Sequence, residues 1–205
     1  MSEFLVPIIA DMAHSDPLPD PDLVSYYVLE KKRKLYLDTD VDETMTEIHR
    51  MILRWNMEDK GKPAEERDPI WIYIMSDGGN IDHMRMLISA IEASITPVFT
   101  VNIGSAHSAA SLIFIAGKKR FMAKYASVII HEGAAQIGGD AIKVQDQADS
   151  YKKIIKWMKD YILDHTNIPK AQLMRRHAND WELDADYCLK NGVCDVIIES
   201  LDEVI

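Results

Sequence analysis

The sequence predicts an α/β domain with a largely parallel sheet, and two observations carry that prediction. Short apolar runs alternate along the chain with longer segments whose apolar residues recur every three or four positions, the pattern of strands followed by helices. No internal repeat interrupts this alternation, and a chain of 205 residues is long enough for one domain. Strands joined by helices pair most readily in parallel, with helices covering the sheet.

The first half of the chain supplies three predicted strands and two helices. The strands are short runs of apolar and β-branched residues, bounded by polar or glycine-rich segments, at residues 35–37, 70–75 and 97–103. Between them, apolar side chains fall on one helical face over residues 43–57 and again over residues 81–91. A helix therefore separates successive strands, as parallel pairing requires.

The second half continues the alternation. An apolar helix begins at Ser108, and a short strand over residues 126–131 follows it. Apolar residues spaced by three and four then mark one long amphipathic helix over residues 140–165, whose opposite face is charged. Its length predicts an arm that reaches out to another subunit. A last helix, capped by Asp184, precedes a strand over residues 193–198.

Composition narrows the class of protein. Residues 1–22 are expected to form a flexible N-terminal arm, and residues 23–205 a single domain. A net charge of −10 argues against a nucleic-acid surface, which needs clustered Lys and Arg. No apolar run reaches the ~20 residues of a membrane helix, and no basic leader opens the chain, so we expect a cytoplasmic protein. The two cysteines predict neither a disulfide framework nor a zinc site.

Three predicted strands end in polar or glycine-rich tips: SDGG at 76–79, GSAHS at 104–108 and HEG at 131–133. α/β proteins build their sites in loops beyond the strand ends. Paired glycines leave backbone N–H groups facing a ligand, and the helix that follows adds partial positive charge, a combination suited to an oxyanion hole. The alternative is a tight turn without further function.

Ser108 is the candidate nucleophile among these residues. Serine at a helix start is commonly an N-cap, and that interpretation stays open. Against it, Ser105 is equally able to cap, and three neighbouring alanines keep space open for a substrate carbonyl: Ala106, Ala109 and Ala110. A serine hydroxyl also needs a base, because it barely ionises near neutral pH.

His131 and Asp180 are the candidates for the other two members of a triad. His131 ends the strand beside the one that leads to Ser108, whereas the side chain of His107, adjacent to Ser108, should diverge. Asp180 would hold the imidazole in its tautomer, and Asp184 is better explained as a helix cap. The order Ser…His…Asp and the alanines flanking the serine exclude an α/β-hydrolase. From spacing alone, a serine hydrolase and structural roles stay equally supported.

Four segments together resemble one family. IWIYIMSDGGNID, GSAHSAASLIFIAGKKRF, SVIIHEG and NDWELDADYCLKNGVCDVI have the order and near spacing of the proteolytic subunit of the Clp protease (ClpP), over about residues 35–204. The resemblance implies the crotonase-like α/β spiral of βαβ units, with a protruding handle helix at about residues 140–165. It implies a serine endopeptidase without cofactor or metal. It also implies stacked heptameric rings, fed with unfolded polypeptides by an ATP-dependent AAA+ unfoldase.

Carried over by position, the resemblance assigns roles to single residues. It makes Ser108 the nucleophile, His131 the general base and Asp180 its orienting carboxylate. The other assignments are Gly79 and Ala109 as oxyanion-hole amides, Gly78, Gly138 and Gly139 in the substrate groove, and Trp71 and Tyr73 in a pocket for the unfoldase. The last two are equally well explained as core residues of a strand. A strand over residues 134–139 would hold an extended peptide by β-augmentation.

The chain also departs from the family pattern. Asp77 stands where the family has proline, which places a carboxylate near the oxyanion hole, and Ala109 and Ala110 replace a Met-Gly pair. The loop over residues 57–69 is longer than usual, and residues 1–22 lack the usual N-terminal pattern. These departures indicate a divergent or phage-type member. Two alternatives stay open: a catalytically silent ring subunit, and an acyl-CoA enzyme of the same fold with an adenine-nucleotide pocket.

Overall fold

The computed structural model describes residues 21–205. Residues 34–205 form one compact unit, and helix α1 (Pro21–Lys31) belongs to a separate unit formed by the preceding segment. The expected N-terminal arm, residues 1–22, lies outside the described residues except for its last two, which begin α1. Within the described chain, no helix combines the length and the apolar character needed to cross a membrane.

The compact unit is built on a seven-stranded sheet with helices between the strands, which confirms the predicted α/β class. Its strands are β1 (Lys34–Leu37), β2 (Ile70–Ser76), β3 (Val98–His107), β4 (Lys119–Ala123), β5 (Ser127–Ile130), β6 (Trp181–Leu183) and β7 (Val196–Ile198). Its α-helices are α2 (Met45–Asp59), α3 (Ile81–Ala93), α4 (Ala109–Ile115), α5 (Ala141–His165), α6 (Lys170–Arg176) and α7 (Ala185–Lys190), with 3₁₀ turns η2 (Ala64–Glu66) and η3 (Leu201–Glu203). In the described chain, the strand pairs are parallel except β5 with β6.

Strand β3 organises the sheet because it pairs with three neighbours. It runs along β2, its residues 99–102 pair with β4, and its residues 105–107 pair with β5. Since these pairings are parallel, β2, β3 and β5 all point toward the same edge of the sheet. The three unusual strand tips of the sequence therefore come together at that edge.

Two strands, β4 and β6, fall outside the pattern that the sequence predicts. β4 begins with Lys119 and Arg120, so its apolar signal is confined to Phe121 and Met122, which are both buried. β6 is only three residues long and lies in a segment that reads as the approach to a helix. Short strands of this kind are stabilised by their neighbours, β3 and β7 for β4 and β5 for β6, more than by local preference.

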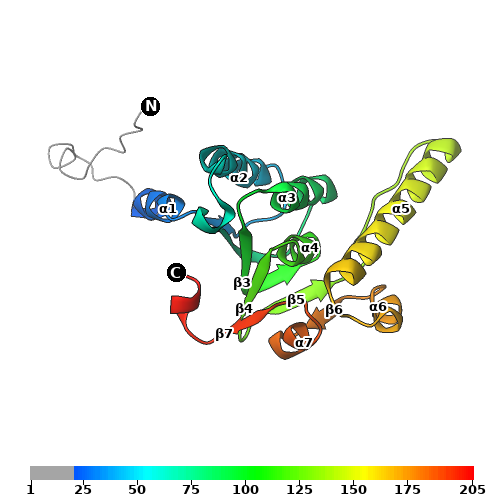
Figure 1. Ribbon diagram of the computed structural model, residues 1–205. Helices are drawn as coiled ribbons and strands as arrows, with labels where there is room; N and C mark the ends of the chain where they lie inside the picture. The colour runs from blue at the N-terminus through cyan, green and yellow to red at the C-terminus, as the bar shows by residue number, and fades with distance from the viewer. Residues whose placement is uncertain (1–20) are drawn as a thin grey trace. The chain divides into compact units, whose positions relative to one another are not determined.

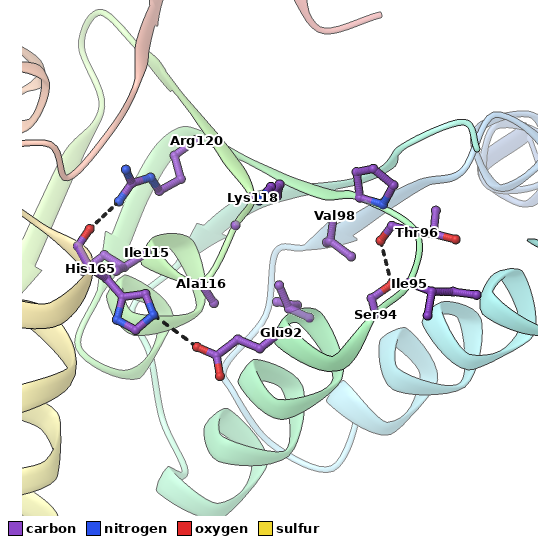
Figure 2. A pocket seen from close by; sticks show the side chains of 13 residues that line it. Glu92, Ser94, Ile95, Thr96, Val98, Ile115, Ala116, Lys118, Arg120 and His165 are labelled. Atoms are coloured by element: carbon purple, nitrogen blue, oxygen red, sulfur yellow. Dashed lines mark hydrogen bonds and ion pairs between the residues drawn. The ribbon is translucent and has the colours of Figure 1, made fainter. Parts of the chain in front are cut away.

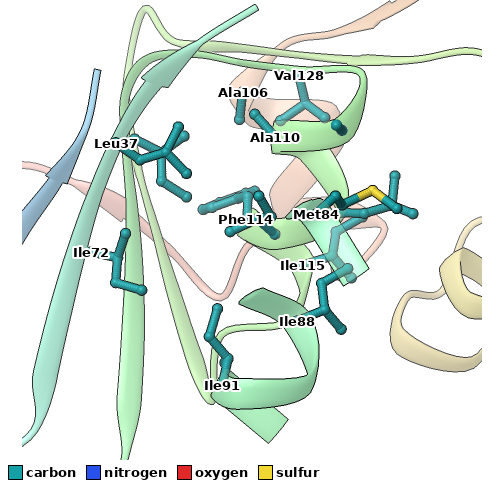
Figure 3. Packing of buried hydrophobic residues seen from close by; sticks show 14 of the residues in the cluster. Leu37, Ile72, Met84, Ile88, Ile91, Ala106, Ala110, Phe114, Ile115 and Val128 are labelled. Atoms are coloured by element: carbon teal, nitrogen blue, oxygen red, sulfur yellow. The ribbon is translucent and has the colours of Figure 1, made fainter. Parts of the chain in front are cut away.

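The two faces of the sheet carry different side chains. Along β2, Ile70, Ile72 and Ile74 are completely buried in the main core, where Figure 3 shows Ile72. Helices α2, α3 and α4 cover this core (Figure 1). The alternate residues Trp71 and Tyr73 join an aromatic cluster with residues of β3, β4, β7 and the C-terminal segment. Side chains that alternate between the two faces of a strand account for this division.

Phe114, in the last turn of α4, is completely buried in the main core (Figure 3). Phe114→Ala is expected to lower the free energy of unfolding by about 3–5 kcal/mol, because it removes a buried ring and leaves a cavity. Urea unfolding followed by circular dichroism measures the change. The control is Tyr125→Ala, at a side chain that is 91% exposed, with an expected change within about 0.5 kcal/mol. Equal losses in both variants would contradict this description of the core.

The long helix α5 contacts the rest of the compact unit near its carboxyl end. Its buried residues are Met158, Tyr161 and Ile162, whereas Ile142 and Val144 at its other end are exposed. Figure 1 shows the helix extending beyond the sheet. It matches the long helix expected over residues 140–165, and the Asp140 side chain caps it by accepting from the Lys143 N–H at 3.0 Å.

Candidate active site

Ser108 lies in the tight turn between β3 and α4 with an unusual backbone conformation. Its φ is 53°, and among the described non-glycine residues only Arg33 shares a positive φ. Such a conformation costs about 1–3 kcal/mol, so the surrounding structure must hold it in place. One holding contact is the bond from the Ser108 N–H to the Ile129 carbonyl, 2.9 Å long. The Ser108 side chain caps nothing in α4, so the N-cap interpretation is wrong.

The Ser108 hydroxyl bonds to His131 instead, and His131 bonds to Asp180. Ser108 Oγ lies 2.6 Å from His131 Nε2, and His131 Nδ1 lies 2.8 Å from Asp180 Oδ1. A carboxylate only accepts, so Nδ1 carries the proton and Nε2 accepts from the serine hydroxyl. The His131 side chain is 28% exposed and the Asp180 side chain 77% exposed, so solvent reaches this hydrogen-bonded chain.

The strand pairings explain why these three residues meet. β3 and β5 run parallel, and their pairing brings Ser108 to the end of β5. β5 and β6 run antiparallel, with Ile130 opposite Trp181. Because these two strands run in opposite directions, the residue after Ile130 lies beside the residue before Trp181, and these are His131 and Asp180. The unpredicted strand β6 therefore positions the carboxylate.

The SDGG segment at residues 76–79, called here the glycine turn, follows β2 and lies directly against the turn of Ser108. Val41 holds it from the other side: its N–H donates to the Gly78 carbonyl at 2.8 Å, and its carbonyl accepts from the Asn80 N–H at 2.6 Å. In such a parallel bridge the Gly79 N–H faces away from Val41. Gly78 has φ +99°, and a Cβ built on it would lie 2.7 Å from the Ser108 Cβ. The contact therefore leaves no room for a side chain at position 78.

The Ala109 N–H is the second amide beside Ser108. Ala109 is the first residue of α4, where N–H groups have no carbonyl one turn earlier to bind. Ser111 closes that turn, its N–H and its hydroxyl both donating to the Ser108 carbonyl at 3.0 and 2.6 Å. The Ala109 nitrogen lies 2.9 Å from the Cβ position of Gly78. The Gly79 and Ala109 amides thus belong to adjoining turns, an arrangement suited to an oxyanion hole.

Asp77 and His107 form a contact that the sequence analysis missed. Asp77 Oδ1 lies 3.2 Å from His107 Nδ1, and the Asp77 side chain is 86% exposed. The other ring nitrogen, His107 Nε2, lies 2.9 Å from Ser127 Oγ. His107 therefore diverges from Ser108, as expected. The contact depends on how β2, β3 and β5 lie side by side, so no local sequence signal reveals it.

The segment that follows His131 differs from the expectation. Residues 134–139 form no strand, so the predicted substrate-binding strand is wrong as an element of this fold. A strand needs a neighbour for its backbone groups, and here the Gly138 N–H bonds to the Gln147 side chain at 3.1 Å. Gly138 has open space at its Cβ position, and Gly139 has φ +130°. Both glycines lie in an exposed, irregular segment between β5 and α5.

Glu132, directly after His131, is held by α5. Its carboxylate accepts from Lys159 Nζ at 2.6 Å, and its carbonyl accepts from the Tyr151 hydroxyl at 2.8 Å. The bond to Lys159 lowers the pKa of Glu132. The completely buried His177 lies 3.5 Å from the same carboxylate, and neither of its ring nitrogens has a hydrogen-bond partner among the described residues. Helix α5 is thus linked to the strand end that carries His131.

The buried His177 predicts a loss of stability in mild acid. Burial lowers the pKa of His177 and nearby Lys159 lowers it further, although Glu132 acts in the opposite direction. As pH falls, the unfolded chain takes up this proton before the folded chain does, so the free energy of unfolding decreases below about pH 6.5. Thermal unfolding at about pH 7.5 and about pH 5.5 measures the decrease, and His177→Leu is expected to reduce it. An equal decrease in that variant would refute the assignment.

Trp71 and Tyr73, the expected docking pocket, belong to the aromatic cluster on the second face of the sheet. Tyr73 is buried, and its hydroxyl donates to the Val204 carbonyl. Burial raises the pKa of Tyr73 to about 12. Lys34 Nζ donates to the same carbonyl at 3.1 Å, and Val204 packs on the cluster. Tyr73 thus fits the core interpretation, whereas Trp71 stays partly exposed.

A cavity of about 640 Å³ lies at the amino end of β3 (Figure 2). Ser108 follows the opposite, carboxyl end of that strand. Three of the cavity's lining residues, Glu92, Arg120 and His165, are linked to one another. His165 Nε2 lies 3.3 Å from Glu92 Oε1, and Arg120 donates to the His165 carbonyl at 2.9 Å. Because the cavity does not adjoin the Gly79 and Ala109 amides, it gives no support to the acyl-CoA alternative.

The α/β fold and the hydrogen-bonded serine, histidine and aspartate have the arrangement of a serine hydrolase. Comparison with known families agrees, since the model of the Clp protease family matches residues 22–201. The chain belongs to the Clp protease family, and its fold is the crotonase-like α/β spiral. The family and the peptidase activity expected from the four sequence segments are therefore confirmed.

Relatives of this chain are similar over most of its length but at low identity. The ATP-dependent Clp protease proteolytic subunit of Deinococcus radiodurans is 26% identical over 87% of this chain and 86% of its own. Proteolytic subunit 2 of Corynebacterium diphtheriae is 28% identical over 85% of this chain and 86% of its own. Proteolytic subunit 2 of Borreliella burgdorferi is 29% identical over 65% and 69%. These identities fit a divergent member of the family.

Proposed function

We propose that this chain hydrolyses peptide bonds with Ser108 as nucleophile, His131 as general base and Asp180 as the carboxylate that orients His131. The observation that carries the proposal is the hydrogen-bonded chain from Ser108 Oγ through the imidazole to Asp180. His131 takes the hydroxyl proton as the oxygen attacks the substrate carbonyl, and it returns that proton to the leaving amine. Water then attacks the acyl-enzyme through the same base, which releases the second product and restores Ser108.

We assign the oxyanion hole to the backbone N–H groups of Gly79 and Ala109. Negative charge develops on the substrate carbonyl oxygen during attack, and two preorganised amides stabilise it. The close approach of Gly78 to the turn of Ser108 supports this assignment, as does the Gly79 N–H that faces away from Val41. Since the donors are backbone groups, alanine at position 109 leaves them intact.

The exposed segment that contains Gly138 and Gly139 is proposed to form one wall of the substrate groove. It begins a few residues after His131, and its exposed backbone N–H and carbonyl groups are accessible to an extended peptide. Gly78 contributes differently, because its N–H donates to the Ser76 hydroxyl and its carbonyl accepts from Val41. Gly78 therefore permits the close approach of the turn and does not itself hold the substrate.

The working form is proposed to be a homo-oligomer of stacked rings, expected to be heptameric, that encloses the active sites. Exposed apolar residues at the amino end of α5, such as Ile142, support contact with another copy. Unfolded polypeptides are the proposed substrates, since enclosure admits only threaded chains. An AAA+ unfoldase is the proposed partner, supported by relatives whose names describe ATP-dependent proteases.

A fluorophosphonate probe followed by peptide mass spectrometry tests the proposal. The wild-type chain is expected to be labelled on Ser108, Ser108→Ala to lose the label, and His131→Ala to be labelled far more slowly. Ser105→Ala, which removes a nearby hydroxyl on β3, serves as the control and should keep the label on Ser108. Labelling at other residues only, or none, would refute the proposal. Native mass determination tests the assembly separately, and a stable monomer would refute the ring.

A further inference from the structure

We infer that His107 is a positioning residue that joins the three segments carrying the proposed site, with Asp77 and Ser127 as its partners. These residues form a second Asp–His–Ser chain, separate from the one that ends at Ser108. The inference rests on the proposed function of Ser108. It adds residues that act through the oxyanion hole and the nucleophile, without touching the substrate.

The two hydrogen bonds show how the imidazole of His107 is held. Nδ1 lies 3.2 Å from Asp77 Oδ1, and Nε2 lies 2.9 Å from Ser127 Oγ. Since a carboxylate only accepts, Nδ1 donates to Asp77 and Nε2 accepts the proton of the Ser127 hydroxyl. Both ring nitrogens are therefore engaged, and the side chain is only 21% exposed. A ring held at both ends acts as a rigid link between the segments it joins.

Each member of this chain stands close in sequence to a group of the proposed site. Asp77 lies in the glycine turn, which supplies one oxyanion amide, and His107 directly precedes Ser108. Ser127 begins β5, the strand that leads to His131. One imidazole therefore connects the oxyanion turn, the nucleophile and the strand of the base.

On the side of the nucleophile, the glycine turn is tied to β3 at its first residue, where Ser76 pairs with Ala106, and then through the side chain of Asp77. On the opposite side, the Ser76 hydroxyl donates to the Thr39 carbonyl at 2.6 Å, beside the backbone bridge described above. Toward the nucleophile, Gly78 is in close contact with the turn of Ser108. This contact limits how near the two turns can lie, but it does not fix the orientation of the glycine turn. The bond between Asp77 and His107 supplies the orientation. Oxyanion donors act at about 2.7–3.1 Å, so a small rotation of the turn loses stabilisation of the transition state.

The same connectivity makes Ser127 a second candidate nucleophile, and its surroundings argue against that role. Its backbone is part of the ladder between β5 and β3, and its carbonyl accepts from the Asn102 side chain at 2.8 Å. The neighbouring Gly104 N–H donates to Asn102 Oδ1 at 3.1 Å, so that amide is occupied. A nucleophile without oxyanion donors gains little from its base. The hydroxyl of Ser127 is therefore assigned to holding His107.

Steady-state kinetics of the full-length protein on a fluorogenic peptide test this inference. Asp77→Asn and His107→Gln are each expected to lower kcat about 10- to 100-fold with little change in KM, because the misplaced amides are needed mainly in the transition state. The double variant is expected to have a kcat no lower than that of the less active single variant, since both changes remove the same link. Asp82→Asn removes an exposed carboxylate at the start of α3 and is the matched control, with kcat at the wild-type level.

Ser127 variants and probe labelling complete the test. Ser127→Ala is expected to slow fluorophosphonate labelling of Ser108, and Ser127→Thr, which keeps the hydroxyl, to restore it toward the wild-type rate. Wild-type kcat in both Asp77→Asn and His107→Gln, additive losses in the double variant, or a label on Ser127 would overturn the inference and leave the proposed function standing. Absence of label on Ser108 in the wild type would overturn the proposed function, and this inference with it.

Discussion

Replacing His131 with alanine is expected to lower kcat for peptide hydrolysis about 10⁴-fold, the upper range for loss of a general base. The Ser108 hydroxyl lies 2.6 Å from His131 Nε2. Without this acceptor, no base is in place to take the hydroxyl proton as the serine oxygen attacks the substrate. The fold should persist, because the imidazole is partly exposed and lies beyond the end of β5. Turnover of a short fluorogenic peptide measures the effect, with thermal unfolding as the check on folding.

His49→Ala is the matched control for that prediction. His49 is a partly exposed histidine on α2, outside the three segments that carry the proposed site. Its replacement is expected to leave kcat at the wild-type level. A His131→Ala protein that retains a tenth or more of the wild-type kcat would show that another group takes the serine proton.

Replacing Gly78 with alanine is expected to abolish most activity and to destabilise the fold. A Cβ at this position would lie 2.6 Å from the His107 carbonyl oxygen and 2.7 Å from the Ser108 Cβ. Backbone atoms cannot yield as a flexible side chain can, so the glycine turn must move away from the nucleophile. Displacement of about 1 Å in such a site costs about 100-fold in rate, and the φ of +99° adds strain.

Gly61→Ala separates the steric effect from the backbone strain. Gly61 also has a positive φ, +90°, but no atom lies within 4 Å of its Cβ position. Its replacement is expected to cost about 1 kcal/mol of stability and to leave kcat unchanged. Both variants are compared by kcat and by thermal unfolding. Similar kcat values for the two would mean that the approach of the glycine turn to Ser108 has no catalytic importance.

The fold class could be predicted because its signals are local. The run at residues 70–75 alternates between two apolar faces, and α4 is buried on all sides, so both appear as apolar segments. β4 could not be predicted, because it begins with the charged residues Lys119 and Arg120. These two residues are in a strand because they pair with β3, which the local sequence does not reveal. β6 is too short to show periodicity, and its pairing with β5 is visible only in three dimensions.

The candidate site was predictable to the extent that its residues end predicted strands. Ser108 and His131 follow strands that pair with each other, so their proximity follows from a parallel sheet. Asp180 depends on β6, and the sequence pattern alone offered no reason to place it opposite His131. The chain through His107 was missed because it depends on the lateral order of three strands. The strand expected over residues 134–139 was wrong, since a lone segment has no neighbour to pair with.

The positive φ of Ser108 sets stability against the hydroxyl at this position. Glycine would adopt that conformation with less strain than serine does. Ser108→Gly would therefore relieve the backbone, but it would also remove the oxygen that lies 2.6 Å from His131 Nε2.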